Sequence, residues 1–169
     1  RYCDTQFVPE NLIQLDVEHN QITPTHHAFL GCNKLQTLYL AGNRLKTLDF
    51  LYMPELTYLY LFESRNLSTL SNSTFSCKTK LSRINFKYTN GDVMNGTVLH
   101  YLKQLNEIIL PQMECDCTVR EIWQWLRSRN MHYEIENDED LDLCLSQLEC
   151  NTSATITNYQ RNETSAEND

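Results

Sequence analysis

The stretch LQTLYLAGNRL, residues 35–45, decides the fold. Leu38 and Leu40 lie on one side of an alternating run, as in a short strand with one buried face. Asn43 comes where the chain would turn out of that strand. A buried amide side chain there can pair with backbone groups that the turn leaves unpaired. The stretch therefore predicts a strand followed by a turn, both with an apolar inner side.

The same pattern recurs along the chain at intervals of 21 to 25 residues. Five stretches begin, in order, at Leu12, Leu35, Leu56, Leu81 and Leu105. The first two fit L-x-x-L-x-L-x-x-N-x-L, with Val17 and Ile22 as conservative replacements. Residues 12 to about 115 thus resemble the extracellular leucine-rich repeat family. The resemblance implies an α/β solenoid, a short repeat array with a parallel sheet on its concave face.

The inner positions of the coils change along the array. The asparagine position is occupied, in chain order, by Asn20, Asn43, Ser64, Thr89 and Met113. The pattern therefore weakens toward the C-terminus. Phe29 and Phe75 lie between strands, and we expect them on the convex side of the core. Each buried Leu or Phe contributes about 1.5–3 kcal/mol of gross hydrophobic stabilisation.

The segment CDCTVREIWQWLRSRN, from Cys115, predicts an amphipathic helix. Its apolar positions, spaced for one helical face, are Cys117, Val119, Ile122, Trp125 and Leu126. It resembles the cysteine-flanked cap that closes extracellular repeat arrays, so a disulfide-bonded helical C-terminal cap is expected. Spacing alone leaves three pairings of four cysteines open, and a zinc site is the alternative. The resemblance implies Cys115–Cys144 and Cys117–Cys150.

The remaining cysteines are Cys3, Cys32 and Cys77. Cys32 and Cys77 fall at similar convex positions two coils apart, about 10 Å at the usual strand spacing, which is too far for a bond. This favours a Cys3–Cys32 disulfide and leaves Cys77 as the odd thiol. Cys77 is then a buried free cysteine or the site of an intermolecular disulfide in a homo- or heterodimer.

These patterns divide the chain into four parts. The expected parts are an abbreviated N-terminal cap at 1–11, about five repeats at 12–114, a cysteine-rich cap at 115–150 and a disordered, glycosylated tail at 151–169. The tail is polar and has too little apolar content to pack.

The compartment follows from the cysteines and the glycosylation sequons. The sequon asparagines are Asn66, Asn72, Asn95, Asn151 and Asn162. Five sequons and seven cysteines together indicate the secretory route, where disulfides form. We therefore expect an extracellular, secreted glycoprotein, with anchoring to the cell surface as the alternative. The chain begins at Arg1 without a signal peptide, as a mature form or a fragment would.

Several functions are disfavoured by the sequence. A net charge of −8 argues against nucleic acid as the main partner. No run of 18 apolar residues exists, so direct membrane insertion is not expected. No catalytic motif and no glycine-rich phosphate loop is present. We expect neither an enzyme nor a cofactor or metal.

The positions between the strand leucines predict the concave face. The first column is Gln14, Thr37, Tyr58, Arg83 and Glu107; the second is Asp16, Tyr39, Tyr60, Asn85 and Ile109; the third is Glu18, Ala41, Phe62, Lys87 and Pro111. Large aromatic rings thus gather in mid-sheet where polar residues are usual, with charges on both sides. The alternative is that the rings only stack across strands and stabilise the sheet.

This patch predicts a site for an extracellular protein ligand. Aromatic anchors surrounded by charge are typical of protein-binding hot spots. The residues expected to contact the partner are Tyr39, Tyr58, Tyr60, Phe62, Arg83, Asn85, Lys87, Asp16 and Glu18. Members of the family act as immune recognition factors, receptor ectodomains and ligand traps. A secreted recognition protein is the leading interpretation, and the ectodomain of a membrane-anchored receptor or co-receptor is the alternative.

Overall fold

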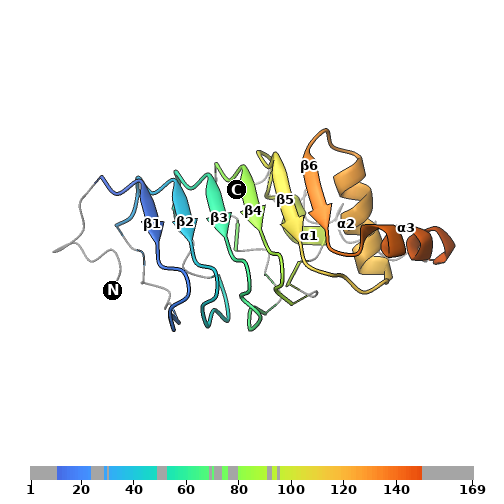
Figure 1. The fold of residues 1–169 in the computed structure, drawn as a ribbon. Helices are drawn as coiled ribbons and strands as arrows, with labels where there is room; N and C mark the ends of the chain where they lie inside the picture. The colour runs from blue at the N-terminus through green and yellow to red at the C-terminus, as the bar shows by residue number, and fades with distance from the viewer. Residues whose placement is uncertain are drawn as a thin grey trace, which may run out of the picture.

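The chain forms a solenoid whose six parallel strands lie side by side in chain order (Figure 1). The computed structural model describes residues 11–23, 29, 31–48, 53–68, 70, 74–75, 80–90, 93–94 and 96–149. The strands are β1 (Gln14–Asp16), β2 (Thr37–Tyr39), β3 (Tyr58–Tyr60), β4 (Arg83–Asn85), β5 (Glu107–Leu110) and β6 (His132–Ile135). The helices are α1 (Gly96–Leu99), α2 (Cys117–Arg127) and α3 (Asp138–Gln147). The predicted repeat fold with a parallel sheet is confirmed.

The register of the sheet follows the repeat. The middle residues of the first five strands pair in one row, which runs Leu15, Leu38, Leu59, Ile84 and Ile108. From Leu38 onward these side chains are fully buried. Phe29 and Phe75 are also buried, as predicted for the convex side of the core. Each coil can bury these apolar side chains only against its neighbours, which makes the array cooperative.

The turn after each of the first four strands contains one residue in the left-handed region. His19, Gly42, Glu63 and Tyr88 have φ values of 50°, 63°, 59° and 58°. The backbone N–H of Gly42 donates to Phe62 O at 2.8 Å, and that of Glu63 to Lys87 O at 3.0 Å. A Cβ atom at Gly42 would lie 2.4 Å from Nδ1 of His19. Glycine is therefore the fitting residue at this turn for both space and backbone conformation.

The prediction that the asparagine side chain pairs with backbone groups of the turn is confirmed in the second coil. The buried Asn43 amide donates to Val17 O and Leu40 O, both at 2.9 Å, and accepts the N–H of Ile22 at 3.0 Å. Asn20 makes the same kind of local bond, 3.0 Å to Val17 O, but at the exposed first coil.

In the third and fourth coils, a residue with a hydroxyl group occupies the asparagine position. Thr89 Oγ1 donates to Phe86 O at 2.7 Å. Ser64 is fully buried, and no partner for its hydroxyl is found in the part of the chain that the structure describes. A hydroxyl has fewer donors than an amide, so Ser64 and Thr89 can bond fewer backbone groups of the turn than Asn43 does.

The C-terminal segment folds onto the last repeat through α2 and α3 (Figure 1). Asp116 caps α2, because its Oδ1 accepts the N–H of Val119 at 2.8 Å. Val119, Ile122 and Leu126 of α2 are buried, and so are Leu141 and Leu145 of α3. Three residues of the predicted helical face thus meet the core, while Trp125 is half-buried and Cys117 is exposed.

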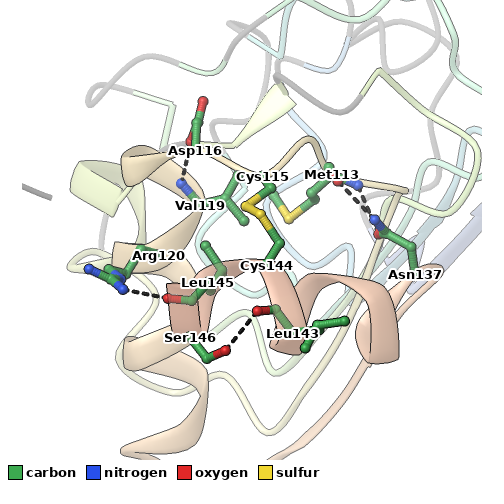
Figure 2. Close-up of a disulfide and its surroundings, with 10 residues drawn as sticks. All are labelled: Met113, Cys115, Asp116, Val119, Arg120, Asn137, Leu143, Cys144, Leu145 and Ser146. Atoms are coloured by element: carbon green, nitrogen blue, oxygen red, sulfur yellow. Dashed lines mark hydrogen bonds between the residues drawn. A yellow bond between two sulfur atoms is a disulfide. The ribbon is translucent and has the colours of Figure 1, made fainter. Parts of the chain in front are cut away.

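A disulfide joins Cys115, before α2, to Cys144 in α3 (Figure 2). This is the pairing that the family resemblance implies. Cys32 and Cys117 are also disulfide-bonded. Their predicted partners, Cys3 and Cys150, lie outside the described residues, so these two pairings stay predictions. Because Cys115, Cys117 and Cys144 are in disulfides, the zinc alternative is wrong for these three cysteines.

Three elements were not predicted from the sequence: the short helix α1, the helix α3 and the strand β6, which extends the sheet beyond the fifth coil. Its Glu134 pairs in parallel register with Ile109 of β5. Asn137 follows β6 and bonds the backbone of Met113 in both directions, at 2.9 and 3.1 Å (Figure 2). The cap therefore continues the sheet and its turn, rather than only covering the last coil with helices.

Some predictions fall on residues that the structure does not describe. They concern most of the N-terminal cap, Cys77, the tail at 151–169 and the sequon asparagines Asn72, Asn95, Asn151 and Asn162. These predictions are untested.

Candidate functional site: the aromatic concave face

The sheet brings the predicted aromatic residues together on one surface. Register pairs Thr37 with Tyr58 in one column and Tyr39 with Tyr60 in the next. Phe62 lies in the third column, two residues after the end of β3. All four aromatic side chains are half-buried, so each keeps a part of its ring in contact with solvent. We name Tyr39, Tyr58, Tyr60, Phe62 and Tyr88 the aromatic patch.

Tyr39 and Tyr60 form the centre of the aromatic patch. Their ring centroids lie 4.6 Å apart and their planes differ by 14°, which is a stacked pair. The partial burial of Tyr60 raises the pKa of its phenol, and the neighbouring Tyr39 raises it further. The phenol of Tyr60 thus stays protonated at neutral pH and can donate a hydrogen bond to a partner.

Tyr88 belongs to the aromatic patch, although sequence reasoning missed it. Its ring meets Phe62 edge to face, with centroids 5.1 Å apart. Its side chain is 40% exposed, the largest exposure among the large apolar residues of this surface. Tyr88 lies outside the three predicted columns and occupies the left-handed turn position, φ 58°. The repeat register, which places position 88 at the same turn as Gly42 and Glu63, is the sequence signal that could have identified it.

The two predicted cations of this face are paired within the chain. Arg83 lies over the ring of Tyr58 at 5.3 Å and contacts Glu107 at 3.1 Å. Lys87 contacts Glu134 of β6 at 2.9 Å and lies 5.6 Å from the ring of Tyr88.

The hydrogen bond from Lys87 to Glu134 raises the pKa of the lysine. Both cations therefore already have an anionic partner within the chain, and each also lies near an aromatic ring. Because both ion pairs are partly open to water, each contributes little to stability.

The other charged positions of the face are mostly acidic. Asp16 is exposed, and its Oδ1 accepts the N–H of Glu18 at 3.1 Å. Asn85 occupies the equivalent position in β4, and its Oδ1 accepts the N–H of Lys87 at 2.9 Å. Across the six strands, the acidic residues of the columns are Asp16, Glu18, Glu107, Glu134 and Glu136, against Arg83 and Lys87 as bases. The concave face therefore carries a negative excess that suits a basic partner surface.

The described residues of this face offer stacking, hydrogen-bonding and ionic contacts. Among all the described residues, no group of three or more His, Cys, Asp or Glu side chains is arranged to hold a metal ion. Within the same ranges, no helix has the length and apolar character needed to cross a membrane. Asn66, the sequon asparagine that the structure describes, is exposed in a turn after β3 and outside the concave columns.

Comparisons with known proteins agree with this architecture. Residues 33–88 match the family model described as Leucine Rich repeats (2 copies). No curated protein matches the chain. A solved chain from an octameric complex of Latrophilin 3, Unc5D and FLRT2, the last represented by its LRR region, is similar in structure, with a TM-score of 0.54 and 19% identity.

That match covers 76% of this chain and 48% of the solved chain. The chain thus spans about half the length of the structure that it resembles. At this identity the likeness supports the fold alone. Together with the six-stranded parallel sheet, these matches show that the chain contains leucine-rich repeats and has the fold of a leucine-rich repeat protein.

Proposed function

We propose that this chain is an extracellular recognition module that binds a protein partner through its concave face. The observation that carries the proposal is the aromatic patch. Its half-exposed rings are contiguous on one face and bounded by charged side chains. Partly exposed aromatic side chains with a charged rim are the usual composition of a protein-binding hot spot.

Internal stacking explains a part of the patch but not all of it. The Tyr39–Tyr60 pair and the Arg83–Tyr58 contact each stabilise the sheet. The edge-to-face contact of Phe62 with Tyr88 is also favourable, but it leaves Tyr88 widely exposed. The solvent-exposed parts of these two rings carry a hydration cost that a bound partner would remove.

The extracellular setting is supported by the cysteines and by Asn66. The Cys115–Cys144 disulfide and the oxidised Cys32 and Cys117 fit an oxidising compartment. Asn66 is exposed and lies away from the concave columns, so a glycan there would leave the face open. A secreted immune recognition factor or a ligand trap fits these properties without any enzymatic activity.

Removing the central ring tests the proposed function. Tyr60→Ala should weaken the binding of the native partner by about 2 kcal/mol or more, the size of a hot-spot effect. The partner is first captured from the native fluid with the whole chain as bait, and its affinity is then measured by calorimetry. Loss of the Tyr39 stack should cost about 1 kcal/mol of folding stability, so affinity is measured well below the melting temperature.

The matched control is Tyr101→Ala. Tyr101 is 43% exposed and lies in the turn after α1, outside the concave columns. Its removal should leave the affinity unchanged. Equal affinities of the wild type and Tyr60→Ala would contradict the proposed concave site.

A further inference from the structure

The described part of the chain contains a recurring arrangement of an aromatic ring, a cation and a carboxylate. On the concave face, Arg83 lies between the Tyr58 ring and Glu107, at 5.3 and 3.1 Å. In the cap, Arg127 lies 4.2 Å from the centre of the Trp123 ring and 2.8 Å from Asp142. A cation within about 6 Å of a ring centre is attracted to its π face. The nearby carboxylate adds a second, ionic contact.

Lys87 makes a third example of the same arrangement. It lies 5.6 Å from the Tyr88 ring and 2.9 Å from Glu134. The first two examples join residues of strands or helices, whereas Lys87 and Tyr88 of the third lie in the turn after β4. On the concave face, the two cations belong to the C-terminal side of the aromatic patch.

The N-terminal side of the patch presents a ring and a carboxylate without a cation. Asp16 is the register partner of Tyr39, and Tyr39 is the register partner of Tyr60. Tyr60 covers one face of the Tyr39 ring, at 4.6 Å between the ring centroids. The rings stack along the direction in which the strands follow each other. The opposite face of Tyr39 is therefore turned toward β1 and Asp16.

Two acidic residues lie near this second face, and the structure shows no cation paired with them in the part of the chain that it describes. Asp16 is exposed and Glu18 lies two residues further along. The hydrogen bond from the Glu18 N–H to Asp16 Oδ1 orients the carboxylate and leaves its second oxygen available.

We propose that the open face of Tyr39, beside Asp16, takes a cationic side chain of the protein partner, with arginine the best fit. This deepens the proposed function and rests on it, because it names the chemistry of the partner at one position. An arginine can stack its planar guanidinium on the ring and pair with the carboxylate. The acidic excess of the whole concave face favours the approach of a basic surface.

A small probe tests the site without knowledge of the partner. A blocked Gly-Arg-Gly peptide is titrated into the whole chain, and the chemical shifts of the protein are followed by NMR. The expected result is a shift of the Tyr39 and Tyr60 ring protons and of the β1 and β2 amides. A peptide with citrulline in place of arginine has nearly the same shape but no charge, and should produce no shift there. Equal shifts with both peptides would overturn the proposal.

Two variants separate a specific site from net charge. Asp16→Asn should weaken peptide binding about fivefold, from the loss of one ionic contact beside a ring. Glu139→Gln, an exposed position of α3, removes the same charge far from Tyr39 and should have no effect. Equal weakening by both variants would show attraction by net charge alone and would overturn the site. Unchanged binding in Asp16→Asn would overturn it as well.

The same variants distinguish this inference from the proposed function. If Tyr60→Ala loses the captured partner while Asp16→Asn binds it as the wild type does, the cation site is wrong and the concave-face function stands. If Tyr60→Ala keeps the partner, the proposed function fails, and the peptide titration decides the cation site by itself.

Discussion

At the scale of single residues, Asn43 shows how one side chain can hold two coils together. Its amide bonds backbone groups of the first and the second coil, and it is almost completely buried. Buried backbone groups that lose their only partner cost free energy because water cannot replace it. The role of the asparagine in the repeat is therefore one of polar satisfaction rather than of surface recognition.

Replacing Asn43 should consequently have a large effect on stability. Asn43→Ala leaves Val17 O, Leu40 O and the Ile22 N–H with fewer partners, and should lower the free energy of unfolding by about 2–4 kcal/mol. Urea denaturation followed by circular dichroism measures the change. Asn20→Ala is the matched control, since Asn20 holds the same repeat position in an exposed turn. A loss in Asn20→Ala as large as that in Asn43→Ala would contradict the burial argument.

At the scale of elements, the cap depends on a covalent link and on a strand. The Cys115–Cys144 disulfide closes a loop that contains α2, β6 and most of α3 up to Cys144, across 29 positions of sequence. In the same loop, β6 adds to the edge of β5 in parallel register. The disulfide and the β5–β6 pairing therefore support each other, because each limits the movement of the segment that the other fixes.

Removal of this disulfide should destabilise the chain without changing its fold. The double variant Cys115→Ser with Cys144→Ser should lose about 3–4 kcal/mol, by the chain-entropy estimate for a loop of about 30 residues. Thermal unfolding under non-reducing conditions provides the measurement. Asp116→Ala, which removes only the cap of α2, should lose about 1 kcal/mol. A double variant that melts with the wild type would show that the non-covalent contacts of the cap suffice.

The elements also show which parts of the fold the sequence predicts. The first five strands follow from leucines at fixed spacing, since a missing leucine would leave a gap in the core. β6 has Tyr133 where the other strands have Leu or Ile, so the pattern did not identify it. It forms because β5 presents an open edge and Asn137 completes the turn at Met113.

The candidate site was predictable in part for the same reason. Alternation along each strand places Tyr58 and Tyr60 on the concave face, and the structure has them there. Contacts between side chains depend on distances that no pattern gives. The pairing of Lys87 with Glu134 needed β6, and the place of Tyr88 needed its left-handed turn.

At the scale of the whole molecule, the protonation of the concave face contributes to stability. Burial raises the pKa of Tyr60 above its ordinary value of 10.0, and the bond to Glu134 raises that of Lys87 above 10.5. The folded chain therefore holds these protons more tightly than the unfolded chain. By linkage, the stabilisation is complete below about pH 10 and is lost as the pH rises through the folded pKa values.

The free energy of unfolding should therefore be lower at about pH 11 than at about pH 9, with the loss occurring above about pH 10. Tyr60→Phe should reduce the slope of this loss, because phenylalanine has no proton to release. Urea denaturation at both pH values measures the slope. The difference in tyrosinate absorbance between the wild type and Tyr60→Phe gives an independent record of the Tyr60 titration. A slope in Tyr60→Phe equal to that of the wild type would show that Tyr60 does not contribute to the alkaline loss.

The reciprocal bonds between Asn137 and Met113 have a consequence for how such a molecule can change in length. The cap contacts the last coil through parallel strand pairing and an amide side chain that bonds the neighbouring backbone. One coil contacts the next in the same way. A gene duplication that inserts one whole coil before β5 would thus leave the cap with the same kind of strand edge to pair with. The array could grow or shrink in units of one coil while the cap that ends it stays the same, and the concave face would widen or narrow accordingly.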